Sequence, residues 1–448
     1  MDLNRVSVFG LGYVGLTFSV CLASKGFNVI GVDVDESKVN SINLGEPPFY
    51  EPDLKDLLSD VLSKKLFYAT TSHSEAVLNS SVSFICVGTP SKPDGSIDLK
   101  YVEHVSSDIG LALKGKDEYH LIVVRSTVTP GTTRNLVRSV VEKYSGKICG
   151  VDFGLCMNPE FLREGSAIND IFNSDRIVIG EFDSKSGDLL KKLYVEFYGD
   201  NLPPILRTSL ENAELIKYAN NAFLAMKISF INEVANICEK IDGTDVTIIA
   251  KGLGLDHRIN HRFLNAGLGW GGSCFPKDVK ALISFARKLD YDPVLLRAVN
   301  KVNELQPYRA VEMAKKLIGD LRDKRIAILG LSFKPGTDDM RNAVSIKIIN
   351  RLIEEGAIVI AYDPAAMDNA KRIFGDSIEY ASSILDCLKD ADCTILVTEW
   401  SEFRDLTPED FIKHMRIPAV VDGRRIFHPK EFSSKLKFAA IGLGGFVD

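Results

Sequence analysis

The sequence predicts an α/β protein in which two doubly wound parallel sheets are joined by a central helical layer with a long helix. Three observations support this fold class. Short apolar strands alternate with helical patterns in both halves of the chain, a glycine-bearing turn follows the first strand of each half, and about thirty residues between the halves keep a helical period. A chain of 448 residues exceeds what one hydrophobic core usually supports, so we expect several domains.

The amino-terminal segment, residues 1–203, is expected to form the first sheet domain. The expected strands are residues 6–9, 29–34, 82–87 and 121–124, with a helix over about 12–25. Strands separated by helices pair in parallel, because each crossover returns the chain to the same edge of the sheet.

The middle segment, residues 204–306, is expected to be a helical dimerisation and catalytic domain. From Leu210 to Lys240 apolar residues recur at helical spacing without proline or glycine, which predicts one long helix. After Pro307 the alternation returns, and residues 307–448 are expected to form the second sheet domain. Its expected strands are residues 325–330, 357–362, 393–398 and 418–422, with a helix near 345–355.

Charge and apolar patterning exclude several classes of function. Lys and Arg total 54 against 60 Asp and Glu, a net charge of −6, so no broad basic surface exists for nucleic acid. The first strand begins too close to Met1 for a signal peptide, and no apolar run is long enough to span a membrane. We therefore expect a cytoplasmic protein.

The cysteine pattern singles out one residue. The eight cysteines lack Cys-x-x-Cys pairs, so most should be reduced, buried packing residues. Cys274 is the exception, because it follows two glycines rather than aliphatic residues.

The first expected turn carries a dinucleotide-binding fingerprint formed by Gly10, Gly12 and Gly15, with Tyr13 and Val14 inside it. The three glycines would allow the tight turn, the approach of a pyrophosphate and close helix packing. Asp33 ends the next expected strand and would bind the adenosine ribose. Neither Val34 nor Asp35 could neutralise it, which favours NAD over NADP. Two alternatives remain for this turn, namely FAD as the ligand or a glycine turn without a ligand. Both sheet domains are expected to be Rossmann-like.

Cys274 and the long helix supply candidate catalytic groups. Pro276 suits the first turn of a helix, so Cys274 would lie at the positive end of that helix, where the dipole and Lys277 favour the thiolate. Lys217 and Asn221 are four residues apart and share one helix face, from which both could donate to an oxyanion. Taken alone, Cys274 could equally be a packing residue, and Lys217 and Asn221 could be solvent-exposed.

Read together, these segments resemble one family, the UDP-glucose and GDP-mannose dehydrogenases. The resemblance covers nearly the whole chain and is carried by residues 10–15, 87–90, 126–133, 158–165, 214–233, 263–278 and 330–341. It implies a four-electron oxidation of a nucleotide sugar at C6 by two successive NAD molecules, through a thiohemiacetal and a thioester.

The resemblance also implies roles for individual residues. Cys274 would be the nucleophile, Lys217 and Asn221 the oxyanion donors, and Asp278 the acid that orients Lys217 or the water. Glu160 would be the general base in thioester hydrolysis, with Thr127 positioning the water. The remaining family cofactor contacts match Lys38, Thr89, Thr127, Glu164, Lys277 and Arg341.

The substrate is expected between the two sheet domains, with its sugar towards Cys274 and its nucleotide towards the carboxyl half. The matching contacts, besides Lys217 and Asn221, are Phe161, Leu162, Arg163, Glu164, Arg258, Phe263, Leu264, Asn265, Ala266, Gly267, Gly271, Phe333 and Lys334. Arg258 matches an arginine that reaches the neighbouring subunit's site, which implies a homodimer or a higher homo-oligomer. Asn265 departs from the lysine of some members, which leaves the phosphate contact there unassigned.

Residues around Cys274 favour UDP-glucose as the substrate. Ser273 and Phe275 resemble the UDP-glucose branch, whereas the GDP-mannose branch more often has Leu after the cysteine and the N-acetylmannosamine branch has His before it. GDP-mannose and UDP-N-acetylhexosamines remain alternatives. A non-catalytic nucleotide-sugar binding subunit also remains open, as does a zinc enzyme using His257 and His261, although no metal site is expected.

Overall fold

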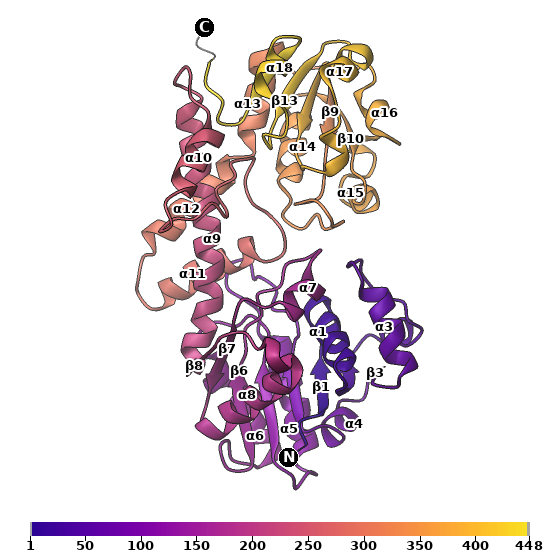
Figure 1. The fold of residues 1–448 in the computed structure, drawn as a ribbon, viewed down its shortest axis with the longest axis vertical. Helices are drawn as coiled ribbons and strands as arrows, with labels where there is room; N and C mark the ends of the chain where they lie inside the picture. Colours follow the sequence, from indigo (N-terminus) through magenta and orange to yellow (C-terminus); the bar gives the residue numbers. More distant parts are fainter. Residues whose placement is uncertain (1, 446–448) are drawn as a thin grey trace. The chain divides into compact units, whose positions relative to one another are not determined.

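The computed structural model describes residues 2–445 and divides into two compact units, Met1–Asn220 and Asn221–Asp448 (Figure 1). Each unit contains one sheet with helices packed against it, and the long helix α9 begins in the first unit and continues into the second. The predicted α/β class, with two sheets and a helical central segment, is confirmed. The division into three domains stays a prediction.

The first unit is built on an eight-stranded sheet with the order β3-β2-β1-β4-β5-β6-β7-β8. The strands are β1 (Arg5–Phe9), β2 (Asn28–Val32), β3 (Phe67–Thr70), β4 (Val82–Ile85), β5 (His120–Val124), β6 (Phe153–Met157), β7 (Ile177–Glu181) and β8 (Ile205–Ser209). The central strands are buried on both faces, as the continuous apolar runs predict for a parallel sheet covered by helices.

One pair of strands departs from the expected parallel sheet. β6 and β7 are antiparallel, and β8 runs parallel to β7. The chain enters β7 at the same edge of the sheet where it leaves β6, so β7 runs in the direction opposite to β6. That edge is where parallel sheets of this class bind ligands, and residues 158–165 therefore begin at it.

The helices of the first unit connect these strands. They are α1 (Tyr13–Ser24), α2 (Glu36–Asn43), α3 (Leu54–Ser63), α4 (His73–Leu78), α5 (Lys100–Leu113), the π-helix η1 (Thr133–Val137), α6 (Arg138–Ser145), α7 (Ala167–Phe172), α8 (Ser184–Tyr198) and the short 3₁₀ turn η2 (Gly199–Asn201).

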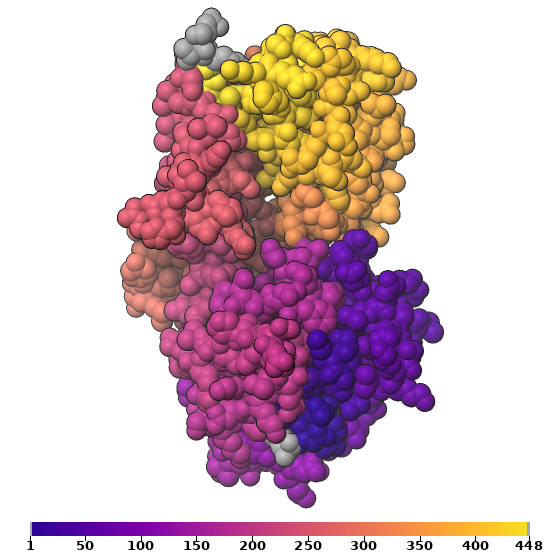
Figure 2. Space-filling view, in the orientation of Figure 1, coloured from indigo at the N-terminus to yellow at the C-terminus, as the bar shows by residue number. Residues whose placement is uncertain are grey.

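The predicted long helix is α9 (Leu210–Cys238), which ends two residues before the expected Lys240. Small and apolar residues such as Ala222, Ala225 and Ala235 are buried along it, while three larger apolar residues on another stripe are exposed. The segment that follows α9, pink to salmon in Figure 2, forms part of the surface. Among residues 2–445, no helix combines the length and the apolar character that a membrane span requires.

The second unit contains a six-stranded, all-parallel sheet with the order β11-β10-β9-β12-β13-β14. The strands are β9 (Arg325–Leu329), β10 (Ile358–Tyr362), β11 (Glu379–Tyr380), β12 (Cys393–Leu396), β13 (Ala419–Asp422) and β14 (Lys437–Ala440). The strands expected in this half are present, each shortened at one end.

Helices precede and flank this sheet. They are α10 (Val246–Gly254), α11 (Phe275–Lys288), α12 (Val294–Leu305), α13 (Tyr308–Ile318), α14 (Val344–Glu354), α15 (Met367–Phe374), α16 (Ile384–Leu388), α17 (Pro408–His414) and α18 (Pro429–Ser433), with 3₁₀ turns η3 (Gly375–Ser377) and η4 (Ser401–Phe403). Because α10 ends at Gly254, His257 and His261 do not lie on a helix, so the helical spacing proposed for a zinc site is wrong.

Candidate active site

The glycine fingerprint lies in the turn between β1 and α1, where each glycine has its own structural reason. Gly10 adopts φ +92°, which a side chain would strain. A Cβ on Gly15 would come within 1.8 Å of the Gly10 carbonyl oxygen, so only glycine lets α1 pack this closely. A Cβ on Gly12 would meet no atom within 4 Å. The backbone therefore borders open space at the start of α1, which is the cradle that a pyrophosphate needs.

Asp33 follows β2 and is held beside this turn. Its Oδ2 accepts hydrogen bonds from the Leu11 N–H and from the Lys38 ammonium, both at 2.9 Å. Lys38 lies in the first turn of α2. Val34 and Asp35, the next residues in the chain, carry no positive charge, but the predicted cofactor contact Lys38 places a cation beside this carboxylate.

The loops that follow β4 and β5 are tied together. The Thr89 hydroxyl donates to the Thr127 carbonyl at 2.9 Å, and the Ser126 hydroxyl donates to the Val87 carbonyl at 2.7 Å. These contacts bring the predicted residues Thr89 and Thr127 together at the carboxyl edge of the sheet.

Glu214 of α9, which the sequence argument did not single out, holds the end of the second loop. Its carboxylate accepts from the Gly131 N–H at 2.6 Å and the Thr133 N–H at 2.7 Å. Burial raises the pKa of Glu214 to about 7, against the effect of the Thr133 and Gly131 contacts. The only signal in the sequence was its position three residues before Lys217, on the same helix face.

Glu160 and Lys217 form a buried ion pair of 2.9 Å within the first unit. Burial alone would raise the pKa of Glu160. The Lys217 ammonium, the Leu162 N–H and the Arg125 guanidinium outweigh burial and hold that pKa below its usual range. The predicted general base is therefore an ionised carboxylate with a hydrogen-bond donor on it.

A second buried carboxylate, Glu51, ties the glycine turn to the segment after Glu160. It accepts from the Tyr13 hydroxyl, from the Gly165 N–H at 2.7 Å and from the Ala167 N–H at 2.6 Å. Burial and the Glu51 carboxylate raise the pKa of Tyr13, which therefore stays a donor. Sequence reasoning missed Glu51, because it is far from both segments in the chain and belongs to no motif that was recognised there.

Cys274 is exposed, whereas the seven other cysteines are buried. It is the N-cap residue of α11, with Pro276 in the first turn, as the sequence predicts. Its carbonyl accepts from the Asp278 N–H at 2.8 Å, and the Ser273 hydroxyl lies 3.4 Å from its sulfur. Cys274 is therefore accessible at the amino-terminal end of a helix, where the helix dipole is positive.

Asp278 is buried one turn into α11 and binds two of the predicted site residues. Its carboxylate accepts from the Asn221 side-chain amide at 2.6 Å and from the Lys277 ammonium at 2.7 Å. The Lys277 charge, which the sequence assigned to the thiol and the cofactor, is thus shared with Asp278. Asn221 lies on α9, four residues after Lys217.

The segment before Cys274 packs against the loop that follows β9 in the same unit. A Cβ on Gly271 would lie 2.4 Å from the Asn342 carbonyl oxygen, and one on Gly272 would lie 2.8 Å from the Phe333 ring. The Gly267 N–H donates to the Asn232 side chain at 2.8 Å. The predicted residues Gly267, Gly271 and Phe333 therefore belong to one packed structure.

Other predicted substrate and cofactor residues differ in exposure. Leu264 and Ala266 are buried and belong to the hydrophobic core of the second unit. Arg163, Arg258 and Arg341 are exposed, and each is paired with a nearby aspartate. The Lys334 ammonium lies 5.6 Å from the centre of the Phe333 ring.

Comparison with known families matches three successive parts of the chain. Residues 4–198 match the NAD binding domain of the UDP-glucose/GDP-mannose dehydrogenase family, residues 211–305 match its central domain, and residues 327–429 match its UDP binding domain. The glycine cradle and Asp33 fall within the first of these matches and fit NAD.

Individual relatives agree with this result. The chain is 44% identical to a UDP-glucose 6-dehydrogenase of Haloferax volcanii over 95% of this chain and 98% of the relative. A UDP-glucose 6-dehydrogenase of Bacillus subtilis is 42% identical over 96% of this chain and 91% of its own length. A solved UDP-glucose dehydrogenase of Pyrobaculum islandicum superposes with a TM-score of 0.90 at 40% identity, covering 98% of this chain and 97% of the other.

A solved UDP-D-ManNAc dehydrogenase of Pyrococcus horikoshii superposes with a TM-score of 0.86 at 29% identity, and the two chains are covered by 98% and 99%. The matches cover between 91% and 99% of the length of these proteins, and the three family domains follow one another along this chain. The chain therefore belongs to the UDP-glucose/GDP-mannose dehydrogenase family and uses NAD as its cofactor.

Proposed function

We propose that the protein is a UDP-glucose 6-dehydrogenase that oxidises C6 of the glucose from alcohol to carboxylate. The observation that carries this proposal is the exposed Cys274 at the start of α11, one turn from the buried Asp278–Asn221 pair. A four-electron oxidation needs a group that retains the reactive aldehyde, and an accessible thiolate can do this. The relatives named UDP-glucose 6-dehydrogenases, and Ser273 and Phe275 on either side of Cys274, support UDP-glucose as the sugar nucleotide.

The first half of the reaction would use Cys274 and the polar face of α9. Bound NAD supplies the hydride acceptor for each of the two oxidations. The Cys274 thiolate adds to the aldehyde carbon, and the aldehyde oxygen becomes an oxyanion. Lys217 and Asn221 donate to that oxygen, and they share one face of α9 because they are four residues apart. When the second hydride leaves C6, the carbon–sulfur adduct becomes a thioester.

The second half would use Glu160. Its carboxylate accepts a proton from a water molecule as the water oxygen attacks the thioester carbon, the carbon–sulfur bond breaks, and the thiolate is released with the carboxylate product. Support comes from the ion pair with Lys217, which keeps Glu160 ionised and therefore able to accept a proton. Thr127 lies in the adjoining loop and would position the water.

The test is a comparison of UDP-glucose, GDP-mannose and UDP-N-acetylmannosamine by absorbance at the NADH band. We expect UDP-glucose to give the highest kcat/KM and two NADH per sugar. Preferred oxidation of another nucleotide sugar would overturn the substrate assignment, and one NADH per sugar would overturn the thioester course. No NADH with any of the three would favour a binding subunit.

We also propose that the protein forms at least a homodimer through α9. Phe223, Phe230 and Ile237 are spaced seven residues apart on one stripe and expose 58%, 53% and 55% of their surfaces. A repeated apolar stripe on a long helix is the pattern that a second identical helix covers. Such a dimer would allow Arg258 to reach the partner's site.

Phe230→Asp should weaken this dimer, because a carboxylate would be buried against the partner helix without a counter-ion. Light scattering during gel filtration should show a smaller mass for the variant at micromolar concentration. Leu44→Asp is the matched control, since Leu44 is exposed in the first unit and lies outside the stripe. Equal masses for wild type and Phe230→Asp would exclude this interface.

We propose the cytoplasm as the location. All eight cysteines are free, and seven of them are buried as thiols. Such a pattern suits a reducing compartment.

A further inference from the structure

We propose that Arg125 is a positioning residue for Glu160, acting through Asn158 and through its own positive charge. The role of Glu160 as a base belongs to the proposed function. Only the predicted effect of Arg125 on kcat rests on that role. The contact between Arg125 and the segment that carries Glu160 can be tested without turnover.

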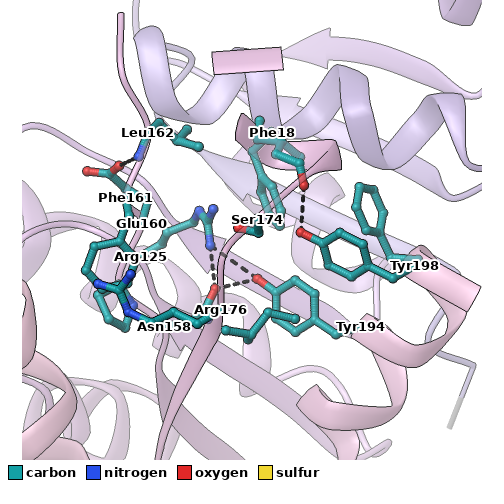
Figure 3. A pocket seen from close by; sticks show the side chains of 14 residues that line it. Phe18, Arg125, Asn158, Glu160, Phe161, Leu162, Ser174, Arg176, Tyr194 and Tyr198 are labelled. Carbon is teal, nitrogen blue, oxygen red and sulfur yellow. Dashed lines mark hydrogen bonds between the residues drawn. The ribbon is translucent and has the colours of Figure 1, made fainter. Parts of the chain in front are cut away.

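Arg125 and Asn158 are the residues that directly follow two paired strands. β5 ends at Val124 and β6 ends at Met157, and these two residues are register partners. The Arg125 guanidinium donates to the Asn158 side-chain oxygen and, at 3.2 Å, to the Tyr194 hydroxyl (Figure 3). The strand pairing therefore places the Arg125 guanidinium beside the Asn158 amide. Asn158 lies two residues before Glu160 in the chain.

The Asn158 side chain uses both of its ends. Its oxygen accepts from Arg125 and from the Tyr194 hydroxyl of α8, and its amide donates to the Val178 carbonyl of β7 at 2.9 Å. Three elements thus hold the first residue of the loop that leads to Glu160. A side chain that is held at both its oxygen and its amide nitrogen has one orientation, so the backbone that follows it is held as well.

Arg125 is closed off from any substrate. Its side chain is 7% exposed, and its guanidinium carbon lies 4.2 Å from the centre of the Phe18 ring. The cavity beside it measures about 20 Å³, which has room for a single water and not for a sugar. Arg125 must therefore act through its neighbours, which is why it is a positioning residue.

The charge of Arg125 has no carboxylate in direct contact. Among residues 2–445 its hydrogen-bond partners are neutral, and Glu160 is the acidic residue that interacts with it electrostatically. A buried cation without an ion pair is costly, and that cost falls when an anion stays nearby. Arg125 and Glu160 therefore stabilise one another across the loop.

The other groups around Glu160 leave this charge balance unchanged near neutral pH. They are the cations Lys217 and Arg176 and the groups Cys86, Tyr194 and Tyr198. Burial raises the pKa of Cys86 and of Tyr194 to about 12, so both are neutral. When Lys217 donates to an oxyanion during the reaction, it shares less of its charge with Glu160. Arg125 is hydrogen-bonded to Asn158 and Tyr194 and is not one of the proposed oxyanion donors, so we expect it to keep Glu160 ionised.

The experiment is an infrared titration of the Glu160 carboxyl in the enzyme without substrate, obtained as a difference against Glu160→Gln. Arg125→Gln removes the charge but keeps an N–H donor for Asn158, and Arg125→Lys keeps the charge. We expect the ionisation midpoint of Glu160 to move to higher pH in Arg125→Gln and to remain near the wild-type value in Arg125→Lys. Arg138→Gln, which removes a charge of the same unit outside this cluster, is the matched control.

An unchanged midpoint in Arg125→Gln would overturn the charge effect. Tyr194→Phe tests the hydrogen-bond effect separately, because it removes one donor to Asn158 and leaves the charge. Amide hydrogen exchange over residues 158–162 should accelerate in Tyr194→Phe. Protection equal to wild type would show that the hydrogen bonds among Arg125, Asn158 and Tyr194 do not hold residues 158–162 in place. Because this measurement uses Tyr194→Phe, it tests the hydrogen-bond effect even if Arg125→Gln does not fold.

The pH profile separates this inference from the proposed function. If Glu160 is the base, the acid limb of kcat moves upward in Arg125→Gln together with the infrared midpoint, and kcat falls by about tenfold at the acid end of the profile, with NAD affinity unchanged. An infrared shift without a kcat shift would remove Glu160 from the base role. It would leave the coupling of Arg125 to Glu160 intact.

Discussion

Cys274 differs from the other cysteines in its surroundings. Two glycines precede it and a helix follows it, so its backbone lies at the start of α11 and its thiol is exposed. Cys274→Ser should lower kcat by roughly a thousandfold, because an alkoxide forms far less readily than a thiolate and a serine ester replaces the thioester. Steady-state turnover with UDP-glucose measures kcat. A titration with NAD measures the NAD dissociation constant, which should not change.

The matched control for this substitution is Cys238→Ser. Cys238 is buried in the second unit and belongs to its hydrophobic core. That variant should lose stability and keep kcat per folded molecule. Wild-type turnover in Cys274→Ser would remove the nucleophile from the proposed course.

Asp33 has two tasks that the structure separates. It holds the Leu11 N–H of the glycine turn, and it is the carboxylate expected to bind the adenosine ribose. Asp33→Ala should raise the NAD dissociation constant by about ten- to a hundredfold, the worth of hydrogen bonds to a charged group. The binding can be followed by NADH fluorescence. Asp60→Ala removes a surface carboxylate of the same unit and should bind NAD normally.

At the scale of elements, α9 carries the polar groups of the proposed site in one register. Glu214, Lys217 and Asn221 recur every three or four residues and therefore share a face. Glu214 holds the loop after β5, Lys217 pairs with Glu160 and Asn221 pairs with Asp278. Within the first unit α9 therefore holds the loop after β5 and the segment of Glu160, and within the second unit it holds Asp278 of α11.

The segment before α11 depends on close backbone packing. Gly271→Ala should displace it, because the new Cβ would lie 2.4 Å from the Asn342 carbonyl oxygen. We expect the KM for UDP-glucose to rise by about tenfold, the effect of misplacing binding groups by a fraction of an ångström. Steady-state kinetics give the measurement.

Gly252→Ala is the control for that change, since a Cβ at this position in α10 meets no atom within 4 Å. It should leave KM unchanged. If Gly271→Ala also leaves KM unchanged, the segment does not contribute to substrate binding through its packing against Asn342.

At the scale of the whole molecule, the first unit buries a titratable group far from the site. His120 in β5 is fully buried, with Nε2 2.7 Å from the Ser83 hydroxyl, and burial lowers its pKa from 6.5 to about 3. The folded protein therefore keeps His120 neutral, whereas the unfolded chain binds a proton below pH 6.5. Stability must fall as pH drops from 6.5 towards 3, by up to about 1.4 kcal/mol per pH unit.

His120→Gln should flatten this dependence, because glutamine does not titrate. Hydrogen exchange of the β5 amides at pH 5, 6 and 7 would report the local free energy of opening. The wild type should lose protection faster than the variant as pH falls. Parallel slopes for the two proteins would show that His120 is not the group responsible.

Local pattern was enough to predict most of the fold. The strands around residues 6–9 and 325–330, the glycine turn and the long helix depend on residues near one another in sequence, because period, turn chemistry and the lack of helix breakers are local properties. Cys274 as an N-cap residue followed in the same way from Pro276. The pairing of strands is not local, and the antiparallel β6–β7 pair was accordingly missed.

The sequence by itself determined the fold class, the cofactor turn with Asp33 and the exposed cysteine before a helix. Only the tertiary structure decided which further groups support them, namely Glu51 on Tyr13 and Arg125 beside Glu160, and that the predicted cofactor contact Lys38 forms an ion pair with Asp33. The physical reason is that a charge acts over a few ångströms of space whatever its separation along the chain. Glu51 and Arg125 acquire their roles from the folded arrangement and lie in no local pattern that predicts them.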